Sequence, residues 1–144
     1  AERLPAILQV LAEGDEETKE ACLERLGLLG ETAVGATPSV LACTEDPSSK
    51  VRAAAALAVA RLRATPDDLV PALLPLLSDE EPSVRINCAI ALSSYGAAAA
   101  AALPELQRMT EEENSKVCAT AKAAIDRIAP GATGPEGDSP SGNQ

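Results

Sequence analysis

The stretch DEEPSVRINCAIAL, residues 79–92, decides the fold. Its apolar side chains Val84, Cys88 and Leu92 recur at every fourth position, which places them on one face of an α-helix. Pro82 indicates the first turn of that helix, because proline lacks a backbone N–H and only the first turn of a helix does not need one. A β-strand would need apolar residues at every second position, and this alternation is absent. The stretch therefore predicts a helix that begins just after an acidic turn.

The same pattern occurs 33 residues earlier as DPSSKVRAAAALAV, residues 46–59. Four sets of residues keep this step of 33 through the chain: Pro5, Pro38, Pro71 and Pro104; Ile7, Val40, Leu73 and Leu106; Thr18, Val51, Val84 and Val117; and Leu26, Val59, Leu92 and Ile125. A unit of two helices buries its apolar face only by stacking on its neighbours. The sequence thus predicts an all-α fold, a right-handed α-α superhelix (solenoid) of four helix-turn-helix units.

Local signals mark the ends of the expected helices. The proline of each unit should stand at the start of its first helix, and Pro75 should loosen the first helix of the third unit. Gly30 and Gly96 fall where second helices should stop. The residues expected just before the second helices are Asp15, Ser48, Glu81 and Asn114, of which three are good N-cap types.

These signals divide the chain into a repeat domain, residues 1–130, and a tail, residues 131–144. The units are expected at about residues 2–34, 35–67, 68–100 and 101–130. The tail is rich in proline, glycine and serine, a composition that cannot build a core, so it is predicted to be disordered.

The turn and helix of residues 79–92, with a second good copy at residues 46–59, resemble the HEAT-repeat signature of the armadillo-type helical repeats. The likeness is strongest to the short bacterial HEAT-like repeats, a group that includes the repeats of phycobilisome lyases. The resemblance implies that an acidic residue in each turn pairs with a basic residue of the second helix along the stack. The acidic residues would be Glu13, Asp46, Asp79 and Glu112, and the basic ones Lys19, Arg52 and Arg85. Cys118 occupies the last basic place, so the ladder should fail in the fourth unit.

Composition narrows the class of function. The formal net charge of −10 disfavours nucleic acid as the main partner. The chain has no histidine, which removes the commonest general base and metal ligand. We therefore expect no enzyme activity, no metal and no cofactor, and no apolar run predicts a membrane span. Three of the four cysteines stand at repeat positions that hold alanine, valine or leucine in other units, and no two cysteines have CxxC spacing. This pattern indicates free thiols and a cytoplasmic protein.

The remaining hypothesis is a scaffold that binds another protein. The second helices of units two to four carry eight basic residues and one acidic residue, on a chain that is acidic overall. Such a face could attract an acidic segment of a partner. The candidate face consists of Arg52, Arg61, Arg63, Arg85, Ser93 and Lys122. Two alternatives stay open: a structural, C-terminal part of a larger HEAT-repeat protein, or an accessory, lyase-like subunit that acts on another protein.

Overall fold

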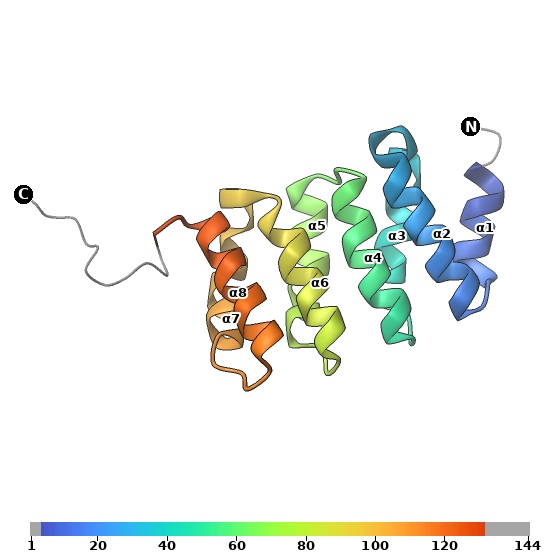
Figure 1. Ribbon diagram of the computed structural model, residues 1–144. Coiled ribbons are helices and arrows are strands. Elements are labelled where there is room, and N and C mark those ends of the chain that lie inside the picture. Colours follow the sequence, from blue (N-terminus) through green and yellow to red (C-terminus); the bar gives the residue numbers. More distant parts are fainter. Residues whose placement is uncertain (1–3, 132–144) are drawn as a thin grey trace, which may run out of the picture.

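The computed structural model describes residues 4–131, which form eight α-helices and three short 3-10 helices and contain no strand (Figure 1). The α-helices alternate between two sets. The first helices of the units are α1 (Leu4–Glu13), α3 (Thr37–Cys43), α5 (Pro66–Leu73) and α7 (Leu103–Met109). The second helices are α2 (Glu16–Leu29), α4 (Ser49–Arg61), α6 (Pro82–Ser93) and α8 (Ser115–Ile128). The 3-10 helices are η1 (Gly30–Ala36), η2 (Pro75–Ser78) and η3 (Gly96–Ala102).

The all-α prediction is confirmed, whereas the right-handed superhelical twist stays a prediction. Residues 132–144, nearly all of the expected tail, lie outside the described residues. We call the pairs α1–α2, α3–α4, α5–α6 and α7–α8 units one to four.

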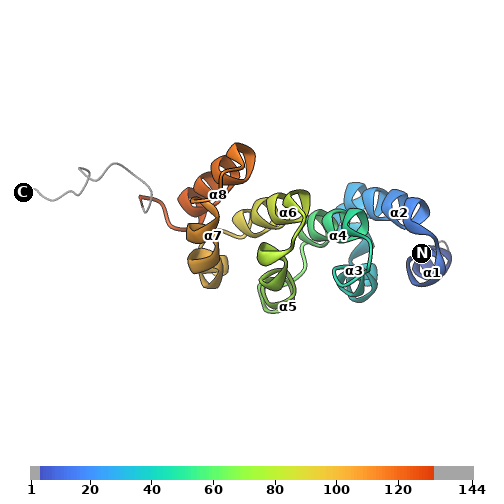
Figure 2. The same ribbon diagram turned by 90° about the horizontal axis from the view of Figure 1, so that it is seen from below.

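The helices form two rows that run side by side along the array (Figure 2). Each second helix packs directly on the next one, α2 on α4, α4 on α6 and α6 on α8. The first helices stand further apart, and the whole array bends so that the second helices line its inner side (Figure 2). We call the solvent-exposed side of α2, α4, α6 and α8, which faces away from the first helices, the concave face.

Three of the four predicted N-cap residues cap the second helices. The side chains of Asp15, Ser48 and Asn114 each accept a hydrogen bond from a backbone N–H of the first turn that follows. Glu81 makes no such bond. Gly30 ends α2 with φ of +59°, a left-handed conformation that costs a residue with a Cβ atom extra energy. Gly96 follows the turn after α6 with φ of +56°.

The proline rule holds in three units and is wrong in the third. Pro38 and Pro104 stand in the first turn of α3 and α7, and Pro5 is the second residue of α1. Pro71 lies inside α5, because that helix begins five residues earlier at Pro66. The second proline of this segment, Pro75, has the predicted effect, since α5 ends at Leu73 and continues only as the 3-10 helix η2.

One continuous core runs between the two rows. The column of Leu26, Val59, Leu92 and Ile125 is buried in every unit, with exposed fractions of 1% or less. The chain has almost no aromatic residues, so alanine supplies much of this core and allows the second helices to approach closely.

One helical run, Glu16–Cys43, is long and apolar enough to cross a membrane by length and composition alone. It consists of α2, η1 and α3, and Gly30 interrupts it with φ of +59° and ψ of −136°. Because the chain changes direction there, the run is not one straight helix, and Leu23, Leu26, Val40 and Cys43 within it are core residues.

Candidate partner-binding face

Three rungs of the predicted ladder of ion pairs lie along one edge of the array, and each rung joins residues 27 apart. Glu13, the acidic residue predicted for unit one, accepts a hydrogen bond from Gln9 and forms no ion pair with a described residue. Lys19 Nζ lies 2.8 Å from Asp46 Oδ2, and Arg52 Nε lies 2.8 Å from Asp79 Oδ2. Arg85 Nη2 lies 2.6 Å from Glu112 Oε1.

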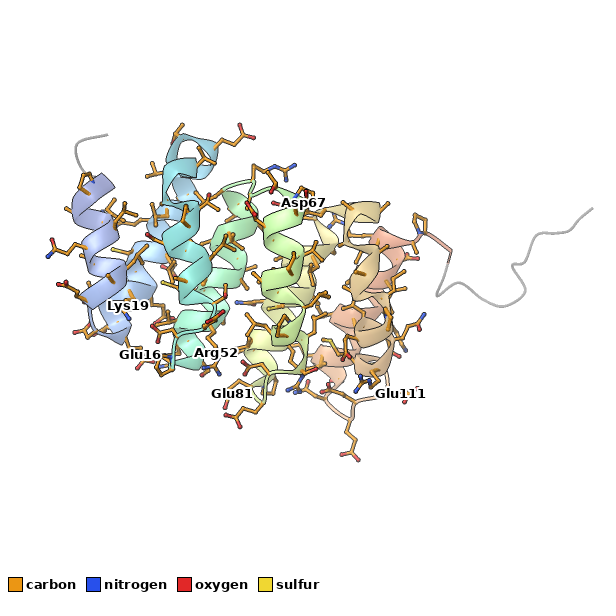
Figure 3. The ribbon with its side chains drawn as sticks, turned by 180° about the vertical axis from the view of Figure 1, so that it is seen from behind. Glu16, Lys19, Arg52, Asp67, Glu81 and Glu111 are labelled. Carbon is orange, nitrogen blue, oxygen red and sulfur yellow. The ribbon has the colours of Figure 1, made fainter. Side chains whose placement is uncertain are left out.

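Figure 3 shows Lys19 and Arg52 on this edge, together with the turn residues Glu81 and Glu111, whereas Asp67 lies at the opposite edge. The ladder therefore connects each unit to the next through the turns that precede the second helices.

The two arginine rungs also tie the turns internally. Arg52 donates through Nη1 to the backbone carbonyls of Asp46 and Pro47, at 2.9 and 3.0 Å. Its other nitrogens, Nε and Nη2, both reach Asp79, so this pair is bidentate. Arg85 donates through Nη1 to the carbonyl of Asp79 but reaches Glu112 through Nη2 alone. Its Nε is buried without a hydrogen-bond partner, which makes this rung the weaker of the two.

The aspartates of the ladder are tuned to stay ionised. Burial by itself raises the pKa of Asp79, but hydrogen bonds from Arg52 and from the backbone N–H of Glu81 outweigh it and hold the pKa below the usual 3.8. Asp46 behaves in the same way, with Lys19 and the backbone N–H of Ser48 as donors against burial. The ladder is thus a network of charges that is stable near neutral pH.

Two residues of the predicted binding face, Arg52 and Arg85, are engaged in the ladder and are not available to a partner. Arg52 and Arg85 keep side-chain exposed fractions of only 15% and 14%, and their guanidinium groups are engaged within the chain. In the fourth unit Cys118 takes their place, and its Sγ lies 3.1 Å from the carbonyl of Thr110 as a weak donor. The expected failure of the ladder at this position is therefore confirmed.

Two further candidates are engaged within the structure, Ser93 inside α6 and Arg63 between units. Ser93 is 7% exposed and its hydroxyl donates to the carbonyl of Ile90, so it is not a contact residue for a partner. Arg63 is exposed, but its guanidinium carbon lies 5.5 Å from the ring centre of Tyr95. The hydroxyl of Tyr95 in turn donates to the carbonyl of Ala64, which joins the end of α6 to the end of α4.

Lys122 is exposed, but it does not belong to the concave face. The residues that occupy the same place in the other units are Leu23, Ala56 and Ala89, and all three are 0% exposed. In those units the next second helix covers the position. Lys122 therefore lies on the end of unit four, where no described helix packs against it.

Arg61 alone of the six candidates lies in a recess of the concave face. The recess has a volume of about 430 Å³ and lies over α2, α4 and the start of α6. Its floor consists of the small or apolar side chains Ala53, Ala54, Leu57 and Ala58. A Cβ atom at Gly27 would lie 3.1 Å from Cδ of Arg61, so glycine leaves room for the arginine side chain to lie against α2.

Charged residues of both signs line this recess, and only one of them was in the predicted face. Lys50 and Arg61 come from α4, and Glu20 and Glu24 come from α2. The 33-residue period of the sequence marks the two basic residues of the recess, because Lys50 is followed by Lys116 after two steps and Arg61 by Arg127. All four of these basic residues are exposed. The sequence pattern counted them as basic without separating them from the arginines of the ladder.

Among residues 4–131, no group of three histidine, cysteine, aspartate or glutamate side chains could hold a metal ion. A profile of the family described as HEAT repeats matches residues 37–126, which spans α3 to α8. No curated protein shows a significant match to the chain. The match covers more than half of the sequence and includes both arginine rungs of the ladder.

Proposed function

Because the chain belongs to the HEAT-repeat family, we propose that it is a non-catalytic scaffold in the cytoplasm whose concave face binds a segment of another protein. Members of this family commonly serve as protein-interaction scaffolds. The observation that carries the proposal is the recess over α2, α4 and α6, which has an apolar floor and a charged border. A chain segment lying there would gain apolar contacts in the middle and charge pairs at the sides.

The charges of the concave face favour an acidic segment over most of its length. Lys50 and Arg61 on α4 and Lys116 and Arg127 on α8 are exposed, and none of them forms an ion pair with a described residue. Exposed charges of one sign steer a partner of the other sign and raise its association rate, with an effect that salt screens. We therefore propose that acidic side chains of the partner lie over α4 and α8.

Site-specific photo-crosslinking tests this proposal. A photoreactive amino acid in place of Ile90, which is 46% exposed on α6, should crosslink the partner in cells that contain the protein naturally. The same amino acid in place of Ala42, which is exposed on α3 in the outer row, is the matched control and should not. Crosslinking from position 90 should also decrease in the double variant Lys50→Glu, Arg61→Glu. Equal crosslinking from both positions, or no effect of the double variant, would contradict the proposal.

A further inference from the structure

The concave face changes sign along the array. On α2 its charged residues at the recess are Glu20 and Glu24, whereas on α4 they are Lys50 and Arg61. On α8 the corresponding residues are again basic, Lys116 and Arg127, and the same places in unit three hold the neutral Ser83 on α6 and Ser94 just after it. One end of the face is therefore acidic, and the basic residues lie on α4 and α8.

These opposite charges do not neutralise each other within the chain. Residues 4–131 contain four ion pairs, of which three are the rungs of the ladder and the fourth joins Arg108 to Glu105. Neither Glu20 and Glu24 of α2 nor Lys50 and Arg61 of α4 take part in them. The charged side chains that line the recess thus remain available to a ligand.

The floor of the recess is held in place by a contact between units. Asn87 Nδ2 of α6 donates to the backbone carbonyl of Ala53 on α4, at 3.0 Å. The small side chains Ala53 and Ala54 let a backbone approach closely, and Leu57 offers a half-buried apolar surface beside them. A ligand that lies here meets the acidic and basic borders at a fixed separation, because α2 and α4 pack against each other.

We infer that the partner segment carries its own charge in the opposite order, with a basic end over α2 and acidic residues over α4 and α8. This inference rests on the proposed function and adds the composition and the direction of the bound segment. Adjacent helices pack at about 9 Å, so α2 to α8 spans roughly 27 Å. An extended chain rises by about 3.3 Å per residue, and a segment of about nine residues therefore covers the face.

Four synthetic peptides, three of them of identical composition, test the inference without knowledge of the natural partner. Each peptide has about nine residues, with alanine and leucine in the middle. One carries its lysines at the amino end and its glutamates at the carboxyl end, a second has the same blocks in the opposite order, and a third has the same residues alternating. These three peptides have the same net charge, so their non-specific attraction to the protein is equal. A fourth peptide has glutamate alone as its charged residue. Fluorescence anisotropy at low and high salt measures their affinities.

One of the segregated peptides should bind about tenfold more tightly than the alternating one, since two or three exposed charge pairs are gained together. The variant Glu20→Lys, Glu24→Lys should lose this preference and bind the all-acidic peptide best. The control Glu31→Lys, Glu45→Lys makes the same change in net charge at exposed positions outside the recess and should keep the parent's preference. A crosslinker on the basic end of the better peptide should react with residues of α2, and one on the acidic end with residues of α8.

Equal binding of the segregated and alternating peptides, or crosslinks from the basic end to α8, would overturn the inference. Best binding of the all-acidic peptide by the parent protein would overturn it while leaving the proposed function intact. Absence of measurable binding for all four peptides would also overturn it. The proposed function fails separately, when the natural partner crosslinks equally from positions 90 and 42.

Discussion

Units three and four place corresponding side chains in different surroundings. Ala89 in unit three is 0% exposed because α8 packs beside it, while Lys122 at the same step of the repeat is exposed on α8. Arg85 in unit three reaches the acidic residue of the next unit, whereas Cys118 in unit four bonds only to the carbonyl of Thr110. By contrast, Leu92 and Ile125 are buried alike.

This difference separates two kinds of burial. A position that is buried in both units is covered without a following described unit, as Leu92 and Ile125 are. A position that is buried in unit three and polar in unit four is covered by the next unit. In unit four no described helix covers the positions of the second kind, and Lys122 occupies one of them. The following predictions test this division, from the largest expected effect to the smallest.

The largest effect is expected in the column that both units bury. The substitution Leu92→Asp places an unpaired charge in the core and should lower the free energy of unfolding by about 4 kcal/mol or more. The corresponding change Ile125→Asp should be about as damaging. Chemical denaturation followed by far-UV circular dichroism measures both. An unchanged midpoint for either variant would show that its side chain is not in the core.

The next prediction concerns the column that differs. Ala89→Lys must push a long charged side chain between α6 and α8, and should destabilise the protein by about 3 kcal/mol. The reciprocal change Lys122→Ala should alter stability by less than about 0.5 kcal/mol, because the lysine is exposed. Thermal unfolding of the two variants gives the comparison. Similar losses from both would mean that position 122 is also covered.

A smaller effect is expected from the ladder. Arg52→Met removes the bidentate partner of Asp79 and leaves that largely buried carboxylate without an ion-pair partner, which should cost about 2 kcal/mol. Lys19→Met breaks a rung with a single bond and should cost less, about 1 kcal/mol. Denaturant titrations of the two variants measure this order. A larger loss for Lys19→Met would contradict the assignment of the stronger rung to Arg52.

The ladder also predicts a loss of stability in acid. The pKa values of Asp46 and Asp79 are lower in the folded state than the usual 3.8, so the folded protein binds these protons less readily than the unfolded chain. Their contribution is therefore complete above this usual value and is lost as the pH falls through the lower folded pKa values. The melting temperature should fall below about pH 4, and it should fall less in Arg52→Met than in the parent. An equal fall in both would assign the acid sensitivity to other carboxylates.

The smallest prediction compares the cysteines of interior and exposed positions. Cys43 and Cys88 are buried, and burial raises the pKa of both thiols, whereas Cys22 and Cys118 are partly exposed. In the folded protein an alkylating reagent should modify Cys118 first and the two buried cysteines only after unfolding. Mass spectrometry after alkylation without reduction should find four modified thiols in the unfolded chain. A pair that resists modification would indicate a disulfide.

Much of the fold follows from residues that act locally. The sequence pattern contains the features that depend on residues close in the chain. These are the helix faces, the buried column of Leu92 and the N-caps at Asp15, Ser48 and Asn114. The proline rule is wrong at Pro71 because α5 begins at Pro66, directly after the extended Thr65, whereas the matching stretches before α3 and α7 form the 3-10 helices η1 and η3.

The sequence by itself determined the repeat, the helix faces and, through the family likeness, the residues of the ladder. Only the tertiary structure decided which basic side chains are available to a partner. Arg52 and Arg61 are both arginines of α4, yet one is held by Asp79 of the next unit and the other borders the recess beside Gly27 of the previous one. The physical reason is that a charge is satisfied or left unpaired by groups distant in the chain, and stacking of the units brings those groups together.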